Sequence, residues 1–264
     1  MIGCAGVGLH SGARVAVTLR PAAEGFGIRF RRVDRPGSPP IPTRAHHAVA
    51  IDGVISLASD AGGSVRMVEH VLGAVAACGI DNILVEISGP ELPIMDGSAR
   101  PFVLLMECAG TVDQARPAAS LQVLGPVEVA SRSGWARLEP ATGLELVVES
   151  HGLSDAPAFT MLFSSESCKR ELVGARDRAG QGVESDAGLR GDDEHSRHAA
   201  LDALGALALI PAQIAGRYIE CGADAALRCA LLRELLNNPR NYSVTGSLPD
   251  AGLWPSGSSL ARAS

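Results

Sequence analysis

A histidine and an aspartate stand four residues apart in the segment 195–210, at His198 and Asp202. Apart from Gly205, this segment contains residues that form or tolerate helices, so both side chains are expected on one helical face, one turn apart. An imidazole and a carboxylate placed in this way can bind one zinc ion. The same spacing also fits an ordinary surface pair without a metal.

A second histidine, His70, begins another apolar helical stretch, and Glu69 precedes it. If the two helices pack together, His70, His198 and Asp202 can converge on one ion and leave its fourth tetrahedral position to water. Glu69 is then placed to accept a proton from that water as a general base. The alternative is that Glu69 is a solvated charge at a helix start, favoured by the helix dipole.

The first part of the chain has the pattern of mixed strands and helices. Alternating apolar residues predict a strand within 1–22, a second strand at 27–32 that forms a hairpin with it, and another strand at 82–88. Helical spacing predicts a buried helix over 67–79 and a second helix over 98–109, capped by Ser98.

Residues 111–120 have no apolar periodicity and are typical of a linker, after which the same order of elements returns. Four strands precede a polar stretch, followed by the helix with His198 and Asp202, a short strand near 216–220 and a helix over 223–236. This repetition predicts an α+β fold of two similar domains, each a mostly antiparallel sheet with two main helices. We expect these domains at 1–114 and 120–264, with a variable insert at about 164–192.

Composition excludes several classes of protein. The 264 residues are 46% hydrophobic and 20% charged, and no apolar run is long enough for a transmembrane segment. A net charge of −6 argues against nucleic acid as the main partner. The six cysteines show neither close pairing nor the density of a disulfide scaffold. The first residues lack the features of a secretory signal, so we expect a cytoplasmic protein.

Five segments carry a resemblance to a known family. They read Gly-Val-Gly-Leu-His-Ser-Gly at 6–12, Val-Glu-His-Val-Leu at 68–72, Gly-Ile-Asp-Asn-Ile-Leu-Val-Glu-Ile at 79–87, Pro-Ile-Met-Asp-Gly-Ser-Ala at 93–99 and Arg-His-Ala-Ala-Leu-Asp-Ala-Leu-Gly at 197–205. In this order the chain resembles the zinc-dependent UDP-3-O-acyl-N-acetylglucosamine deacetylases of lipid A biosynthesis. The resemblance covers nearly the whole chain.

The resemblance implies two similar α+β domains whose helices lie between two outer sheets. It implies one zinc ion bound by His70, His198 and Asp202, with Glu69 as the general base. The implied reaction is hydrolysis of the acetamide of a UDP-linked acylated glucosamine, with release of acetate. A UDP-linked acylated amino sugar is therefore the expected partner, and the oligomeric state is not predicted.

The sequence departs from this family at three catalytic positions. The Lys that follows the second ligand is Ala199, and the Asp two turns after that ligand, which orients a catalytic His in the family, is Ala206. The catalytic His is Ala225, within residues 224–228 (Asp-Ala-Ala-Leu-Arg), where the family has Gly-His-x-Leu-Asn. None of the seven histidines lies beyond His198, so this helix offers no substitute.

These departures leave two hypotheses open. Removing a positioned general acid costs about 10²–10⁴ in rate, and losing the Lys also removes cationic stabilisation. The chain could be a deacetylase in which zinc and Glu69 still support slow hydrolysis, or a catalytically weak or inactive zinc-binding relative with a binding or regulatory role. The retained Glu69 favours the first hypothesis, whereas Ala206 and Ala225 favour the second.

Five other residues are candidates for smaller roles. Ser164 stands near the family's oxyanion-binding Thr, and His151 corresponds to a family His that we place near the substrate phosphates. We expect His10 to stabilise a turn and Asp96 to hold its loop through backbone N–H groups. His195 could supply the missing acid, although a solvent-facing position fits it better.

Overall fold

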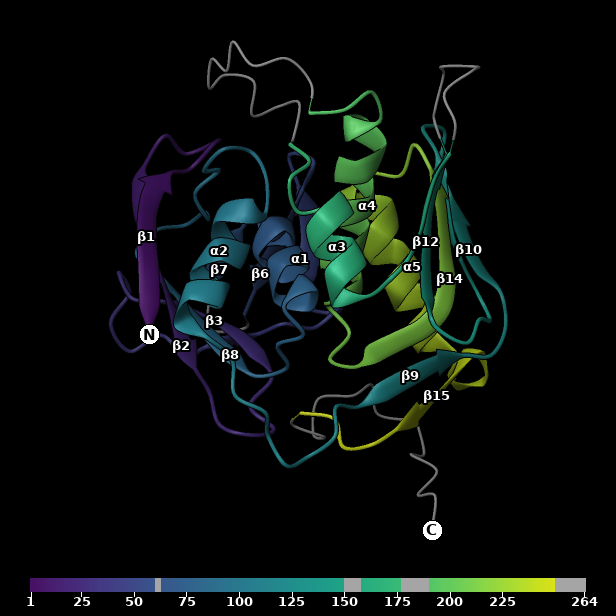
Figure 1. Ribbon diagram of the computed structural model, residues 1–264, viewed down its shortest axis with the longest axis horizontal. Coiled ribbons are helices and arrows are strands. Elements are labelled where there is room, and N and C mark those ends of the chain that lie inside the picture. Colours follow the sequence, from purple (N-terminus) through teal and green to yellow (C-terminus); the bar gives the residue numbers. More distant parts are fainter. Residues whose placement is uncertain (60–62, 150–157, 177–189, 250–264) are drawn as a thin grey trace.

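The computed structural model describes residues 1–59, 63–149, 158–176 and 190–249 (Figure 1). It confirms the predicted α+β fold: helices occupy a central layer, and a sheet covers this layer on each side. The chain runs through one sheet and its helices first, then through the other sheet. Among the described residues, no helix is both long enough and apolar enough to span a membrane.

The first sheet contains five strands in the order β1-β2-β8-β3-β4. These are β1 (Ile2–Val7), β2 (Arg14–Pro21), β8 (Ile83–Ile87), β3 (Ile28–Arg32) and β4 (Ile41–Pro42). The sequence predicted a hairpin between the strand within 1–22 and the strand at 27–32. This prediction is wrong, because β8 lies between β2 and β3. β8 is apolar at nearly every position, so a central place in the sheet buries more of it than an edge does.

The second sheet repeats this arrangement in the order β10-β11-β14-β12-β13. These strands are β10 (Val127–Ala130), β11 (Trp135–Glu139), β14 (Gln213–Cys221), β12 (Leu144–Glu149) and β13 (Phe159–Leu162). In the first sheet the central strand β8 is antiparallel to β2 and parallel to β3. In the second sheet the central strand β14 is likewise antiparallel to β11 and parallel to β12. The shared topology supports the predicted repetition of elements, and the domain boundaries at 1–114 and 120–264 stay a prediction.

Shorter strands complete the sheets. β9 (Ser120–Val123) and β15 (Tyr242–Thr245) extend the second sheet beside the start of β14. β5 (Ala48–Ile51), β6 (Val54–Ala58) and β7 (Ser64–Arg66) form a separate three-stranded sheet. The sequence pattern did not predict β4, β5, β6, β7 or β15: the first three lack alternating polar residues, and β7 and β15 have only three and four residues.

The helices also repeat between the two halves. They are α1 (Glu69–Ala77), α2 (Arg100–Ala109), α3 (Ser165–Glu171), α4 (Glu194–Leu207) and α5 (Ala225–Asn237), followed by a short 3₁₀ helix at Pro239–Asn241. α1 lies in the crossover between the parallel strands β3 and β8, and α4 lies in that between β12 and β14. The N-cap position of α2 belongs to Ala99, one residue after the predicted Ser98, but Ser98 Oγ does accept a hydrogen bond at 3.3 Å from the backbone N–H of Arg100, the first residue of the helix.

Two glycines let α1 and α4 pack closely. A Cβ atom at Gly205 would collide with the backbone of Glu69, and one at Gly73 would come within 2.8 Å of the Leu201 side chain. Gly205, the weakest helix former in its segment, is thus required by the contact between the helices. This contact brings the start of α1 against the middle of α4.

A buried carboxylate anchors the start of α4. Glu194 is 2% exposed. It accepts hydrogen bonds from the backbone N–H of Arg176 at 3.0 Å, from Arg176 Nε at 2.8 Å and from the backbone N–H of Arg190 at 2.7 Å. The Arg176 hydrogen bond is the main cause that lowers the pKa of Glu194 to about 2. Glu194 therefore ties α4 to two segments that precede it.

We expect Glu194→Gln to lower the free energy of unfolding by about 1–3 kcal/mol at neutral pH, because it removes charge-assisted hydrogen bonds. Since the pKa of Glu194 is lowered by folding, its contribution is complete above the usual pKa of a glutamate and is lost as the pH falls toward about 2. Urea unfolding from neutral to acidic pH measures this difference. Glu166→Gln, at an exposed position of α3, is the matched control, and equal stability of the two variants would contradict the assignment.

Candidate metal centre

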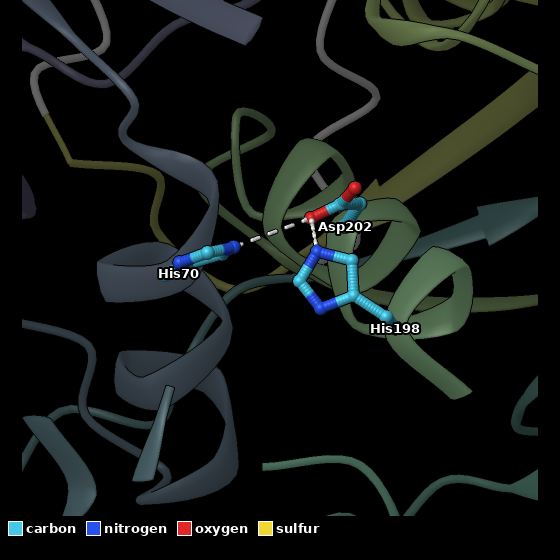
Figure 2. Close-up of side chains that lie close together, drawn as sticks. All are labelled: His70, His198 and Asp202. Atoms are coloured by element: carbon cyan, nitrogen blue, oxygen red, sulfur yellow. Dashed lines mark ion pairs between the residues drawn. The ribbon is translucent and has the colours of Figure 1, made fainter. Parts of the chain in front are cut away.

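Three side chains with metal-binding atoms meet where α1 contacts α4. His70 belongs to the first turn of α1, and His198 and Asp202 lie one turn apart on α4. Asp202 Oδ1 is 3.5 Å from His198 Nε2 and 3.8 Å from His70 Nε2, and the two rings lie nearly perpendicular with centroids 5.0 Å apart (Figure 2). All three candidate ligand atoms lie within 4.8 Å of one another.

The orientation of these side chains fits a shared cation. His198 Nδ1 lies 3.1 Å from the carbonyl oxygen of Ala175, so its Nε2 is the atom that faces Asp202. Asp202 Oδ1 is buried and has no hydrogen-bond partner within the described residues. A buried carboxylate oxygen that faces two imidazole nitrogens is costly without a cation. Two imidazoles and one carboxylate are a donor set that suits zinc and leaves a tetrahedral position open.

Glu69 is the first residue of α1 and is only 6% exposed. The alternative of a solvated charge at a helix start is therefore wrong. Its Oε1 accepts a hydrogen bond from the backbone N–H of Ile55 at 2.5 Å, while its Oε2 is buried and has no hydrogen-bond partner in the described part of the chain. Burial, followed by the charge of Asp202, raises the pKa of Glu69 to about 8. This carboxylate can hold a proton close to neutral pH.

The three positions at which the resemblance predicts lost catalytic groups lie on the same two helices that carry or adjoin the cluster, α4 and α5. Ala206 and Ala225 are buried, and Ala199 is half-buried. Ala206 follows Asp202 by one turn on α4, and Ala225 begins α5, which packs against α4. None of the three can donate a proton or carry a charge.

A charged group beside the cluster was not predicted from the sequence. Arg228 of α5 lies with Nη1 3.4 Å from Asp202 Oδ2, and it also pairs with Glu220 of β14. From the sequence, this position shows only that the Asn of the family pattern is replaced. The sequence gives little sign of this ion pair, because a strand glutamate and a helix arginine eight residues apart usually face solvent.

Two of the minor candidates hold loops, as predicted. Asp96 Oδ1 accepts hydrogen bonds from the backbone N–H and the hydroxyl of Ser98, at 3.1 and 2.8 Å. The backbone N–H of His10 donates to the fully buried carboxylate of Glu91, and His10 Nδ1 lies 2.5 Å from the same group. Both therefore stabilise the polypeptide backbone rather than the cluster.

The remaining minor candidates do not join the cluster. Ser164 caps α3 by accepting a hydrogen bond from the backbone N–H of Ser167, and it lines a groove to which none of the three candidate ligands contributes. His195 lies in the first turn of α4 and is not part of the group of metal-binding atoms found among the described residues. His151 lies outside the described residues.

An α+β fold with a largely buried His-His-Asp cluster and an adjacent glutamate is typical of metal-dependent hydrolases. Comparison with protein families narrows this class. Residues 1–178 match the family model described as UDP-3-O-acyl N-acetylglycosamine deacetylase (LpxC). The chain belongs to this deacetylase family, which is metal-dependent.

Relatives in several bacteria extend the match beyond the family model. Proteins named UDP-3-O-acyl-N-acetylglucosamine deacetylase from Neisseria gonorrhoeae and Neisseria meningitidis serogroup B are each 35% identical over 95% of this chain and 94% of their own length. One from Anaeromyxobacter is 35% identical over 95% of this chain and 91% of its own. The resemblance seen in the sequence motifs is thereby confirmed. These matches include the second half, where His198 and Asp202 lie.

Proposed function

We propose that this chain is a zinc-dependent deacetylase that hydrolyses the acetamide of a UDP-linked acylated glucosamine, as in lipid A biosynthesis, at a reduced rate. One observation carries the proposal: the buried Oδ1 of Asp202 faces both histidine Nε2 atoms, and the buried carboxylate of Glu69 precedes His70 on α1. His70, His198 and Asp202 hold the ion in this proposal. The names of the relatives supply the substrate class.

Glu69 is the proton acceptor of the proposed reaction. When bound, zinc supplies Lewis acidity at this position. Oε1 of Glu69 is held by the Ile55 N–H, which leaves Oε2 to take the proton as water adds to the acetamide carbonyl carbon. The raised pKa makes this carboxylate a stronger base than an exposed one, and a neighbouring cation lowers that pKa toward the working pH.

The amine must receive a proton when the carbon–nitrogen bond breaks and acetate forms. Ala199, Ala206 and Ala225 provide no donor for this step, so in this proposal Glu69 must deliver the proton that it has taken. One group then serves as both base and acid. This double use accounts for the reduced rate that we propose.

A second function is a zinc-binding relative with little or no activity and a binding or regulatory role. The observation that favours it is Arg228, which lies three residues after Ala225 on α5 and pairs with Asp202, one of the candidate ligands. In that case the cluster holds a structural ion. The two functions share the metal centre and differ in turnover.

We expect the purified protein to contain about one zinc ion per chain. His198→Ala and Asp202→Ala should lose it, because each removes one of three ligands. Elemental analysis after dialysis measures the zinc content, and His195→Ala on the same helix is the matched control. A parent protein without zinc after supplementation would refute the proposed centre. With zinc bound, release of acetate from UDP-linked acylated N-acetylglucosamine separates the slow enzyme from the inactive relative.

A further inference from the structure

A buried guanidinium contacts the second oxygen of the candidate ligand Asp202. Arg228 Nη1 lies 3.4 Å from Asp202 Oδ2, while Asp202 Oδ1 faces the two histidines. Arg228 Nη2 lies 3.3 Å from the carbonyl oxygen of Ala199, three residues earlier on α4. The side chain thus crosses from α5 and spans almost one turn of the ligand-bearing helix.

A strand carboxylate fixes this guanidinium. Glu220 of β14 accepts hydrogen bonds from Arg228 Nε at 2.9 Å and from Nη2 at 2.8 Å, which is the bidentate arrangement that sets both position and plane. The Tyr218 hydroxyl donates a further hydrogen bond to Glu220. Tyr218 and Glu220 are each 1% exposed. The sheet therefore holds Arg228 against α4.

The hydrogen bonds of Arg228 leave little for any other partner. Of its five N–H groups, Nε and Nη2 supply three to Glu220 and Ala199, and Nη1 supplies one to Asp202. The residue is also buried. A substrate oxygen cannot replace these contacts without exposing a buried charge.

We propose that Arg228, held by Glu220, is a positioning residue that fixes Asp202 as a one-oxygen metal ligand. The inference rests on the proposed metal centre and adds to it a supporting pair. Arg228 occupies Oδ2, so Oδ1 remains the oxygen that faces His70 and His198. Groups that orient a ligand from behind commonly contribute about 10–100-fold to metal affinity.

The charges of the pair also suit this role. Glu220 balances the charge of Arg228, so Asp202 keeps its own negative charge for the ion. Removing Arg228 alone would strand Glu220 as a buried unpaired charge and could unfold the protein. The double variant Arg228→Met/Glu220→Gln removes both charges and keeps an amide oxygen as the acceptor for Tyr218.

The test is zinc affinity measured by competition with a chelator, together with the visible spectrum of the cobalt-substituted protein. We expect the double variant to bind zinc about 10–100-fold more weakly and to show an altered cobalt spectrum. Arg228→Lys, which keeps the charge but loses the bidentate geometry, should give a smaller loss. Arg233→Met removes an exposed arginine of the same helix that bonds the carbonyl oxygen of Ala48 instead of Asp202, and it should leave both measurements unchanged.

The outcomes separate this inference from the proposed function. A parent protein that binds no zinc refutes the metal centre itself. A parent that binds zinc, with the same affinity and cobalt spectrum in the double variant, refutes only the role of Arg228. If the double variant does not fold, Arg228→Lys decides: unchanged affinity and spectrum in that variant contradict the inference, and a loss in both supports it.

Discussion

The Glu69→Gln variant is expected to lose about 10²–10⁴-fold in deacetylase turnover while it keeps its zinc. The amide can accept the Ile55 N–H as the carboxylate does, so the start of α1 is preserved. It cannot take a proton from water. His70, the next residue of the helix, is unchanged, so this candidate zinc ligand stays in place. Acetate release and zinc content, measured on the same preparation, test the expectation.

The stability of the variant and of the parent, both freed of zinc, provides the control for this result. Burial raises the pKa of Glu69 to about 8, so folding of the parent keeps the carboxyl protonated where the unfolded chain has already ionised. The parent therefore loses stability as the pH rises from the usual range of a glutamate toward about 8, and the neutral glutamine does not. We expect the melting temperature of the variant to exceed that of the parent increasingly over this range.

Two results would contradict the role of Glu69. Turnover that stays at the parent level would show that another group accepts the proton. A variant that is less stable than the parent at every pH would show that Glu69 acts through the fold, because lost activity could then follow from a distorted α1. Glu166→Gln, which changes an exposed glutamate of α3, should alter neither quantity.

The candidate ligands could be predicted because their information is local. The spacing of His198 and Asp202 places them on one helical face, and family motifs point to His70 and Glu69. The packing that joins the two helices is less evident in the sequence. Gly205 was notable only as a poor helix former, yet its missing side chain is what allows α4 to approach Glu69.

The features that the sequence did not predict depend on non-local partners. In the sheet β8 lies between β2 and β3, although β2 and β3 are consecutive strands in the sequence. Arg228 and Glu220 are typical surface residues by type, and only the arrangement of β14, α4 and α5 pairs them behind Asp202. Charge pairing across elements carries no periodic signal. From the sequence, Arg228 therefore indicated only the loss of the family's Asn and gave no sign of its contact with Asp202.

Restoring the missing acid is expected to produce the largest gain in activity. The double variant Ala206→Asp/Ala225→His places a histidine at the start of α5 and a carboxylate on α4 to orient it. We expect turnover to rise by about 10²-fold or more, because the leaving amine regains a proton donor. Both alanines are buried, so the added volume should cost about 1–3 kcal/mol of stability at each site.

The pH profile distinguishes an acid from a change in packing. A histidine acts as a general acid only while it is protonated, so the gain should fall away above its pKa, which is about 6.5 for a free side chain and is raised by the added Asp. The variant Ala206→Asn/Ala225→Gln adds similar volume without a titrating group and should show no gain. If both double variants behave alike, with zinc and fold retained, the missing acid does not limit the reaction.

The restored variant also tests whether Glu69 accepts the proton from water while the new histidine donates a proton to the leaving amine. In the reaction proposed for the parent, Glu69 both accepts the first proton and delivers it to the amine. In the restored variant these tasks fall to two groups, so adding Glu69→Gln should remove only the acceptor and abolish nearly all of the gain. Activity that survives this third change would mean that the histidine acts as the base. A restored variant with zinc but no turnover would instead favour a protein that keeps the ion for binding or structure.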